Sequence, residues 1–229
     1  MDNYQNALPG FPVGLGMAAP DFYANTTFGP LKFSDLRGKW VVLFSHPGDF
    51  TPVCTTEFLA FTEVFSEFEE RNVQLLGLSI DSTPSHLAWI NSIYQSTGVQ
   101  IPFPIIADRT GEIARQYGMI APHVSSQETV RNVYIIDPNQ TIRAILIYPM
   151  TNGRNIYEIL RLVDALQTTD RDKVSTPANW LPDQSVIIPP PKTYSELLQR
   201  QQKMQNGGLS CKDWYLCYNN PDNPQKLIQ

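Results

Sequence analysis

The sequence predicts an α/β protein in which a mixed central sheet is flanked by helices and followed by an extended C-terminal domain. Apolar, β-branched runs alternate with amphipathic segments through residues 20–169, which is typical of strands alternating with helices. Turn residues at 137–140 separate two further apolar runs and add a hairpin, so the sheet is mixed. Prolines become frequent after Thr169. We therefore expect a first domain at 1–169 and a C-terminal extension and dimerisation domain at 170–229.

The first elements are an edge hairpin and a buried strand. Residues 21–26 and 31–33, separated by Gly29 and Pro30, read as the two strands of a short hairpin. Residues 40–44 form a continuous aromatic and β-branched run, which suits a strand that is buried on both faces. We expect this strand to lie inside the sheet.

A helix is expected directly after this strand. Residues 46–49 are a turn signal. Thr51 and Pro52 then mark a helix start, because a hydroxyl can cap the helix and proline fits a position that needs no N–H. Phenylalanines continue the helical spacing on one face, at positions 58, 61, 65 and 68.

The rest of the first domain keeps the same alternation of strands and helices. In order, we expect a strand at 73–80, a helix at 82–94, a strand at 104–107, a helix at 108–117, strands at 133–136 and 142–148, and a helix at 155–166.

The C-terminal extension differs in composition from the first domain. Its prolines interrupt every run, so it cannot form long regular elements and should wrap over another surface. One short helix is expected at 194–204. Residues 209–229 read as a mobile or partner-docked tail that carries Cys211, Cys217 and a cluster of aromatic residues.

Composition excludes several classes of function. The net charge is −5 and no basic cluster is present, which disfavours nucleic acid and an anionic membrane surface as partners. No apolar run approaches the ~20 residues of a membrane span, and no secretory signal is visible at the N-terminus. The odd number of cysteines, 3, argues against a structural disulfide framework and favours functional thiols. We expect a cytoplasmic protein.

Cys54 lies in the expected first turn of the helix that follows the central strand. The thiolate is the nucleophilic form of cysteine, and the unpaired N–H groups and positive dipole end of a helix start favour it. A nearby arginine favours it further. Taken alone, Cys54 fits a buried structural cysteine equally well. The residues around it decide between the two interpretations.

Residues 45–57 read Ser-His-Pro-Gly-Asp-Phe-Thr-Pro-Val-Cys-Thr-Thr-Glu and contain the pattern Pro47-x-x-x-Thr51-x-x-Cys54. This stretch resembles the active-site signature of peroxiredoxins, in the archaeal-type subfamily that has a long C-terminal domain with extra cysteines. The resemblance implies a thioredoxin-like fold for about residues 20–169. It also implies a thiol peroxidase that reduces hydrogen peroxide and organic hydroperoxides without a cofactor or a metal.

The resemblance assigns the residues of the site. It implies that the Cys54 thiolate attacks a peroxide oxygen and becomes a sulfenic acid. Thr51, which is also expected to cap the helix, and Arg131 would align the peroxide and stabilise the developing charge. The other matched positions are Pro47 as a shield for the pocket, His46 as a substrate ligand with Arg131, and Glu57 and Arg154 as residues that orient Arg131. We expect the Arg131 guanidinium to face the Cys54 sulfur, and an entering hydroperoxide to reach that sulfur.

Cys217 is the resolving thiol that the resemblance favours, with Cys211 in an auxiliary role. Many relatives of this subfamily keep only one cysteine, so the pair is a departure toward a two-cysteine cycle. Family dimers place the C-terminal domain of one subunit over the active site of the other, which implies a homodimer with an intersubunit disulfide and allows a toroidal decamer. The expected reductant is a thioredoxin-like dithiol. Because sequence position does not prove proximity, two surface thiols without a link to Cys54 remain an alternative.

Other functions fit parts of the sequence. A thioredoxin-type oxidoreductase would need Cys-x-x-Cys at the helix start, where this chain has Thr51. The spacing of Cys211 and Cys217 is unlike that of common zinc sites. A phospholipase is not expected, because Lys39 stands where some relatives have a lipase-like serine. A peroxide sensor or redox-regulated holdase chaperone would use the same residues as the peroxidase and stays open.

Overall fold

A computed structural model describes residues 13–207 and 209–219. The chain divides into two units, of which the first ends at Ile156 and the second begins at Tyr157. This division lies at the start of helix α5 (Ile156–Asp172), and residue 169, where we expected the first domain to end, lies inside that helix. Among the described helices, none is both long enough and apolar enough to cross a membrane.

The first unit is built on a seven-stranded mixed sheet with the strand order β2-β1-β5-β4-β3-β6-β7. Strand β4 pairs in parallel with β3 and with β5, and the other pairs are antiparallel. The expected mixed sheet is therefore confirmed. The strands are β1 (Tyr23–Thr26), β2 (Gly29–Lys32), β3 (Trp40–Ser45), β4 (Val73–Ser79), β5 (Ile105–Ala107), β6 (Arg131–Ile136) and β7 (Ile142–Tyr148).

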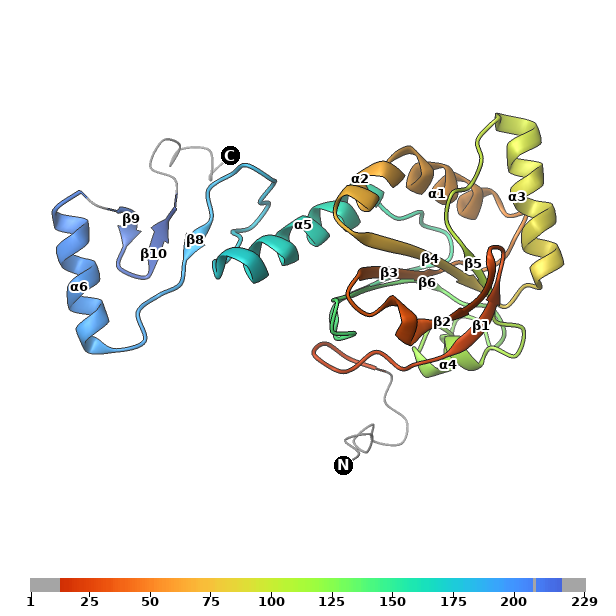
Figure 1. The fold of residues 1–229 in the computed structure, drawn as a ribbon, viewed down its shortest axis with the longest axis horizontal. Helices are drawn as coiled ribbons and strands as arrows, with labels where there is room; N and C mark the ends of the chain where they lie inside the picture. The colour runs from red at the N-terminus through yellow and green to blue at the C-terminus, as the bar shows by residue number, and fades with distance from the viewer. Residues whose placement is uncertain (1–12, 208, 220–229) are drawn as a thin grey trace, which may run out of the picture. The chain divides into compact units, whose positions relative to one another are not determined.

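Helices cover both faces of this sheet. Figure 1 shows helices α1 and α2 on one side and α4 on the other. The helices of the first unit are α1 (Pro52–Glu63), α2 (Phe65–Glu70), α3 (Thr83–Thr97) and α4 (Glu112–Gln116), with a 3₁₀ turn at Phe33–Leu36.

All residues of strand β3 are buried, as its apolar run predicts. Successive side chains of a strand point to opposite faces. Accordingly, Val41 belongs to the core that includes Ala114 of α4, whereas the Phe44 ring packs against Phe61 of α1 with centroids 4.3 Å apart. Strand β3 therefore packs between two helical layers. This packing fixes the position of the loop that follows its carboxyl end.

The phenylalanine stripe does not continue through one helix as the spacing predicted. Val64 leaves helical backbone angles, with φ −107° and ψ 18°, and separates α1 from α2. Phe61 and Phe68 are nevertheless both buried, one on each side of the break. The apolar spacing therefore identified the buried face correctly, while the interruption at Val64 carried no proline or glycine signal.

The second unit contains most of α5, helix α6 (Tyr194–Gln205) and a small sheet of strands β8 (Ile187–Ile188), β9 (Ser210–Asp213) and β10 (Leu216–Tyr218). Its strand order is β8-β10-β9, with antiparallel pairing throughout. The prediction of a mobile tail is wrong for residues 210–218, because backbone pairing and a covalent bond order this segment as a hairpin, while docking on a partner stays a prediction. Residues 220–229 of that predicted tail lie outside the described residues.

Candidate functional site

The loop between β3 and α1 is tied to the start of β6. The Ser45 hydroxyl donates to the Val130 carbonyl at 2.5 Å and accepts from the Asn132 N–H at 3.1 Å. The Thr129 hydroxyl donates to the His46 carbonyl at 2.7 Å. These buried bonds bring Arg131, the first residue of β6, to the loop that leads into Cys54. Two segments that are far apart in sequence thereby meet at one place.

Cys54 lies in the first turn of α1 and is the one cysteine with a free thiol. The Arg131 Nη1 lies 3.4 Å from the Cys54 Sγ, so the guanidinium faces the sulfur. The Nε and Nη2 of Arg131 both donate to the Met150 carbonyl, at 2.9 and 2.7 Å. Because the Met150 carbonyl holds Nε and Nη2 on one side and the Cys54 sulfur accepts from Nη1 on the other, the planar group is fixed in one orientation.

Glu57 joins two buried arginines one turn further along α1. It accepts from Arg131 Nη1 at 2.7 Å and from Arg154 Nη2 at 2.6 Å. Arg154 also donates to the carbonyls of Ser45 and Asn132, at 2.9 and 3.0 Å. Burial lowers the pKa of Arg154, and the nearby Glu57 carboxylate opposes that shift. The cluster therefore contains two guanidinium groups and a single carboxylate, all almost fully buried.

Thr51 precedes α1 with extended backbone angles, but its side chain does not cap the helix. Its hydroxyl donates to the Gly48 carbonyl at 2.8 Å, and its own carbonyl accepts from the Thr55 hydroxyl at 2.8 Å. The capping interpretation of Thr51 is therefore wrong, because this hydroxyl closes the preceding turn instead. The prediction of proline in the first turn is confirmed at Pro52.

Access to the sulfur differs from the expectation. The Cys54 side chain is 0% exposed, and Pro47 in the adjacent loop is buried as well. Phe50, which has a left-handed φ of 56°, is 59% exposed in the same loop. The expectation that an entering hydroperoxide reaches this sulfur is therefore not met in this structure.

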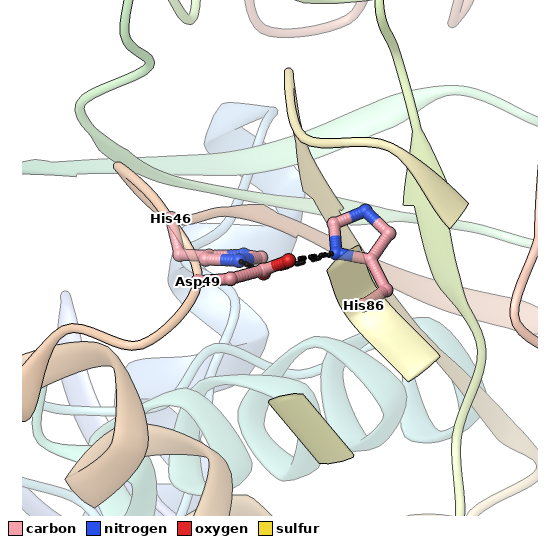
Figure 2. Close-up of side chains that lie close together, drawn as sticks. All are labelled: His46, Asp49 and His86. Carbon is pink, nitrogen blue, oxygen red and sulfur yellow. Dashed lines mark hydrogen bonds and ion pairs between the residues drawn. The ribbon is translucent and has the colours of Figure 1, made fainter. Parts of the chain in front are cut away.

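His46 belongs to a second buried group, which the sequence did not reveal. Asp49 accepts from His46 Nε2 at 3.2 Å and lies 2.9 Å from His86 Nδ1 through both carboxylate oxygens. Figure 2 shows the Asp49 side chain between the two imidazole rings. Burial lowers the pKa of His46 despite its bond to Asp49. Burial raises the pKa of Asp49, but the hydrogen bonds to both histidines outweigh it and hold that pKa well below its ordinary value.

The sequence contained a partial signal for this group. Asp49 lies inside the motif at residues 45–57, three positions after His46. His86 belongs to the first turns of α3 and is 37 positions away from Asp49 in sequence. No spacing rule predicts that contact, because it depends on how α3 packs against the sheet.

The other two cysteines are bonded to each other in the second unit. The Cys211–Cys217 disulfide has an S–S distance of 2.07 Å and links β9 to β10. Cys217 is buried, and Cys211 is partly exposed. This bond differs from the expectation, since the resemblance pairs Cys217 with Cys54 and the odd cysteine count argues against a structural disulfide.

Known proteins resemble this chain in sequence and in fold. The AhpC/TSA family model matches residues 15–145, and the model of the C-terminal domain of 1-Cys peroxiredoxin matches residues 165–203. Peroxiredoxin 2 of Caldanaerobacter subterraneus subsp. tengcongensis is 64% identical over 204 residues, covering 89% of this chain and 91% of that protein. Peroxiredoxin of Aquifex aeolicus is 54% identical over 214 residues, covering 89% of this chain and 95% of that protein.

Solved structures give the same result for the fold. A structure of yeast mitochondrial 1-Cys peroxiredoxin has a TM-score of 0.80 at 43% identity and covers 90% of this chain and 99% of its own. A C45S mutant of peroxiredoxin 6 from Arenicola marina has a TM-score of 0.80 at 38% identity and covers 92% of this chain and 100% of its own. The expected thioredoxin-like fold with a C-terminal extension is confirmed. The family models, the relatives and the solved structures together show that this chain belongs to the peroxiredoxin family and is a peroxidase enzyme.

Proposed function

We propose that the Cys54 thiolate reduces hydrogen peroxide and organic hydroperoxides. The sulfur attacks one peroxide oxygen, the O–O bond breaks, and the leaving alkoxide or hydroxide takes up a proton. Cys54 is oxidised to a sulfenic acid and the peroxide is reduced to an alcohol or water. The observation that carries this proposal is the contact of Arg131 Nη1 with the Cys54 Sγ, at 3.4 Å in a fully buried cluster.

Charge balance supports the thiolate as the reacting form. Arg131 and Arg154 bring two positive charges, and Glu57 supplies one negative charge. Charges at such buried positions interact far more strongly than charges in water. A thiolate at Cys54 is the second negative charge that makes the cluster neutral. The guanidinium of Arg131 then also faces the position where negative charge develops as the O–O bond breaks.

The neighbouring residues have supporting roles in this proposal. Glu57 and Arg154 hold the orientation of Arg131 through the bonds at 2.6–2.7 Å. The Thr51 hydroxyl, which donates to Gly48 in the resting loop, turns toward the peroxide when the loop moves. Pro47 excludes bulk water, and His46 contacts the substrate.

Resolution of the sulfenic acid requires a movement of α1. Because Cys54 is buried, the first turn of α1 has to leave the cluster before another sulfur can reach the Cys54 sulfur. We assign that sulfur to Cys217, which displaces water from the sulfenic acid and forms a disulfide with Cys54. Cys211 can then attack Cys217, which passes the disulfide to the Cys211–Cys217 pair and frees Cys54.

A dithiol of the thioredoxin type closes the cycle by reducing the Cys211–Cys217 disulfide. Cys211 is the sulfur that it attacks, because Cys211 is partly exposed whereas Cys217 is buried. The printed title of the yeast mitochondrial relative describes thiol resolution via glutathione/thioredoxin systems, which supports a reductant of this chemistry here. In this cycle the protein acts as a homodimer, and Cys217 of one subunit reaches Cys54 of the other.

The test is mass spectrometry of the intact, pre-reduced protein after one equivalent of peroxide. Wild-type protein should first form a Cys54–Cys217 disulfide. A Cys211–Cys217 disulfide should then replace it. Cys54→Ser should consume no peroxide, and Cys217→Ser should accumulate the sulfenic acid. Cys211→Ser is the matched control, because it should stop at the Cys54–Cys217 bond. Peroxide consumption that persists in Cys54→Ser would refute the assignment.

A further inference from the structure

We propose that His46, Asp49 and His86 form a binding site for a divalent metal ion of the zinc class. Each residue offers one donor atom, and these atoms lie within 4.8 Å of one another. In a tetrahedral zinc site, bonds of about 2.0–2.1 Å place the donor atoms roughly 3.4 Å apart. The observed separations of 3.2 Å for His46 to Asp49 and 2.9 Å for His86 to Asp49 lie close to that value, and the donor atoms of the two histidines lie within 4.8 Å of each other, so the rings would have to draw together around an ion. Figure 2 shows the Asp49 carboxylate between the two rings, so both histidines face the same carboxylate.

The two ring nitrogens of His86 both face acceptor atoms. Its Nε2 lies 3.2 Å from the Ile106 carbonyl, which can only accept a hydrogen bond, and its Nδ1 lies 2.9 Å from the Asp49 carboxylate. A neutral imidazole has one N–H, so one of these contacts would join two acceptors. Either an extra proton or a metal ion at Nδ1 removes that conflict. Histidine ligands commonly donate their other N–H to a backbone carbonyl, which is the relation of His86 to Ile106.

His46 has the properties of a second nitrogen ligand. Its ring is fully buried, and its Nδ1 has no hydrogen-bond partner in the described structure. An ion beside Asp49 would take the Nε2 lone pair and move the ring N–H to Nδ1, where no described acceptor receives it, so part of the binding free energy is spent on this buried N–H. His46 and Asp49 are also held in place, since Thr129 binds the His46 carbonyl at 2.7 Å and Asp81 binds the Asp49 N–H at 3.0 Å.

The charges near the site suit a divalent ion. Asp49 is one carboxylate ligand, and its side chain is 2% exposed. Asp81 lies behind it, with an oxygen that accepts from both the Asp49 N–H and the Ser79 hydroxyl. These two carboxylates compensate the charge of a zinc-class ion bound to two neutral imidazoles. Three protein ligands also leave a coordination position for water, as in other zinc sites of this composition.

A bound ion would join the loop at residues 46–49 to helix α3. The loop has to move before peroxide or another cysteine reaches Cys54, so an ion that holds it should slow turnover. This consequence rests on the proposed function. The binding itself does not, and the experiment measures it in a protein that cannot react with peroxide.

The experiment uses full-length Cys54→Ser with its Cys211–Cys217 disulfide intact, which has no free thiol to bind zinc. Titration with Zn²⁺ in a calorimeter should show one bound equivalent. His86→Gln and Asp49→Asn should each weaken binding by at least about 100-fold, because each removes a ligand and loss of an outer-shell partner alone costs about 10–100-fold. His123→Gln is the matched control, since His123 is exposed and outside the cluster, and should bind like the parent.

Imidazole ¹⁵N signals give a readout that needs no substitution in the cluster. Added Zn²⁺ should shift the ring signals of His46 and His86 and leave that of His123 unchanged. Absence of one-to-one binding, or shifts confined to His123, would overturn the proposal and leave the group as a hydrogen-bonded ion pair. Equal binding by the parent and a folded His86→Gln or Asp49→Asn would overturn it as well.

Discussion

The two cysteine environments of this protein are built in opposite ways. Around Cys54, hydrogen bonds join residues that are as many as 109 positions apart in sequence, and nearly every partner is buried. Around Cys217, a disulfide closes a sequence separation of 6, in a hairpin whose turn exposes Trp214 and Tyr215. The first environment depends on long-range packing, and the second on a short covalent loop.

This difference determines how each region responds to change. The cluster at Cys54 is stable because buried charges compensate one another, so the loss of one member leaves the others uncompensated. The hairpin at Cys217 is stable because a bond restricts the unfolded chain, and its loss leaves neutral thiols. Substitution of a charged residue should therefore destabilise the cluster at Cys54 most. A reducing agent should destabilise the hairpin at Cys217 most.

Replacement of Glu57 should have the largest effect on stability. Glu57→Gln leaves the guanidinium groups of Arg131 and Arg154 buried without their carboxylate. The free energy of unfolding should fall by roughly 3–5 kcal/mol, as when one partner of a buried ion pair is removed. Denaturant unfolding at neutral pH measures this change. Asp172→Asn, which breaks the exposed pair with Arg171, is the control, and an equal loss in both variants would contradict the comparison.

Arg131→Lys should reduce activity strongly while keeping the charge. A lysine cannot contact the Cys54 sulfur, Glu57 and the Met150 carbonyl at the same time. The second-order rate of peroxide consumption should fall on the order of 100-fold, the scale for loss of one oriented donor at a developing charge. Arg143→Lys, on the neighbouring strand β7, should retain the wild-type rate. A rate near wild type for Arg131→Lys would mean that charge alone is sufficient.

Opening the disulfide should have a smaller effect, confined to the second unit. Cys211→Ser should lower the free energy of unfolding of that unit by about 2 kcal/mol, the loop-closure value for such a short loop. A reducing agent should lower the stability of the wild type by a similar amount and leave Cys211→Ser unchanged. Ser210→Ala is the neighbouring control. If the unfolding transition of the first unit shifted as much as that of the second, the surroundings of Cys54 and of Cys217 would not be independent.

The smallest expected effect is a pH dependence from His46. Burial lowers the pKa of His46 below its ordinary value of 6.5, so below that pH the unfolded chain binds more protons than the folded one. Protonation of His46 therefore favours the unfolded chain, and the free energy of unfolding decreases progressively as the pH falls below 6.5. Unfolding curves between pH 7 and 5 should show a smaller loss in His46→Gln than in the wild type. His123→Gln should behave like the wild type.

Local patterns predicted much of the fold. Strand β7 has the predicted bounds, and strand β3 and the start of α1 follow from a β-branched run, a turn and a proline. These elements depend on side-chain size and backbone preference within a few neighbouring residues. Arg131 was expected opposite Cys54 because both matched a family signature, and spacing alone would not have placed them together.

Three features could not be read from local patterns. The contact of Asp49 with His86, the break at Val64 and the hairpin at 210–218 all depend on surfaces brought together by folding. The access of peroxide to Cys54 was also misjudged, because burial of the first turn depends on how α1 lies against the sheet.

By itself, the amino-acid order determined the alternation of strands and helices, the helix start before Cys54 and the peroxidase signature. These depend on interactions between near neighbours, which a linear pattern records. Only the tertiary structure decided which charges compensate one another around the sulfur, and that two histidines share Asp49. Those contacts follow from the order and register of the strands, which bring together side chains from distant parts of the chain.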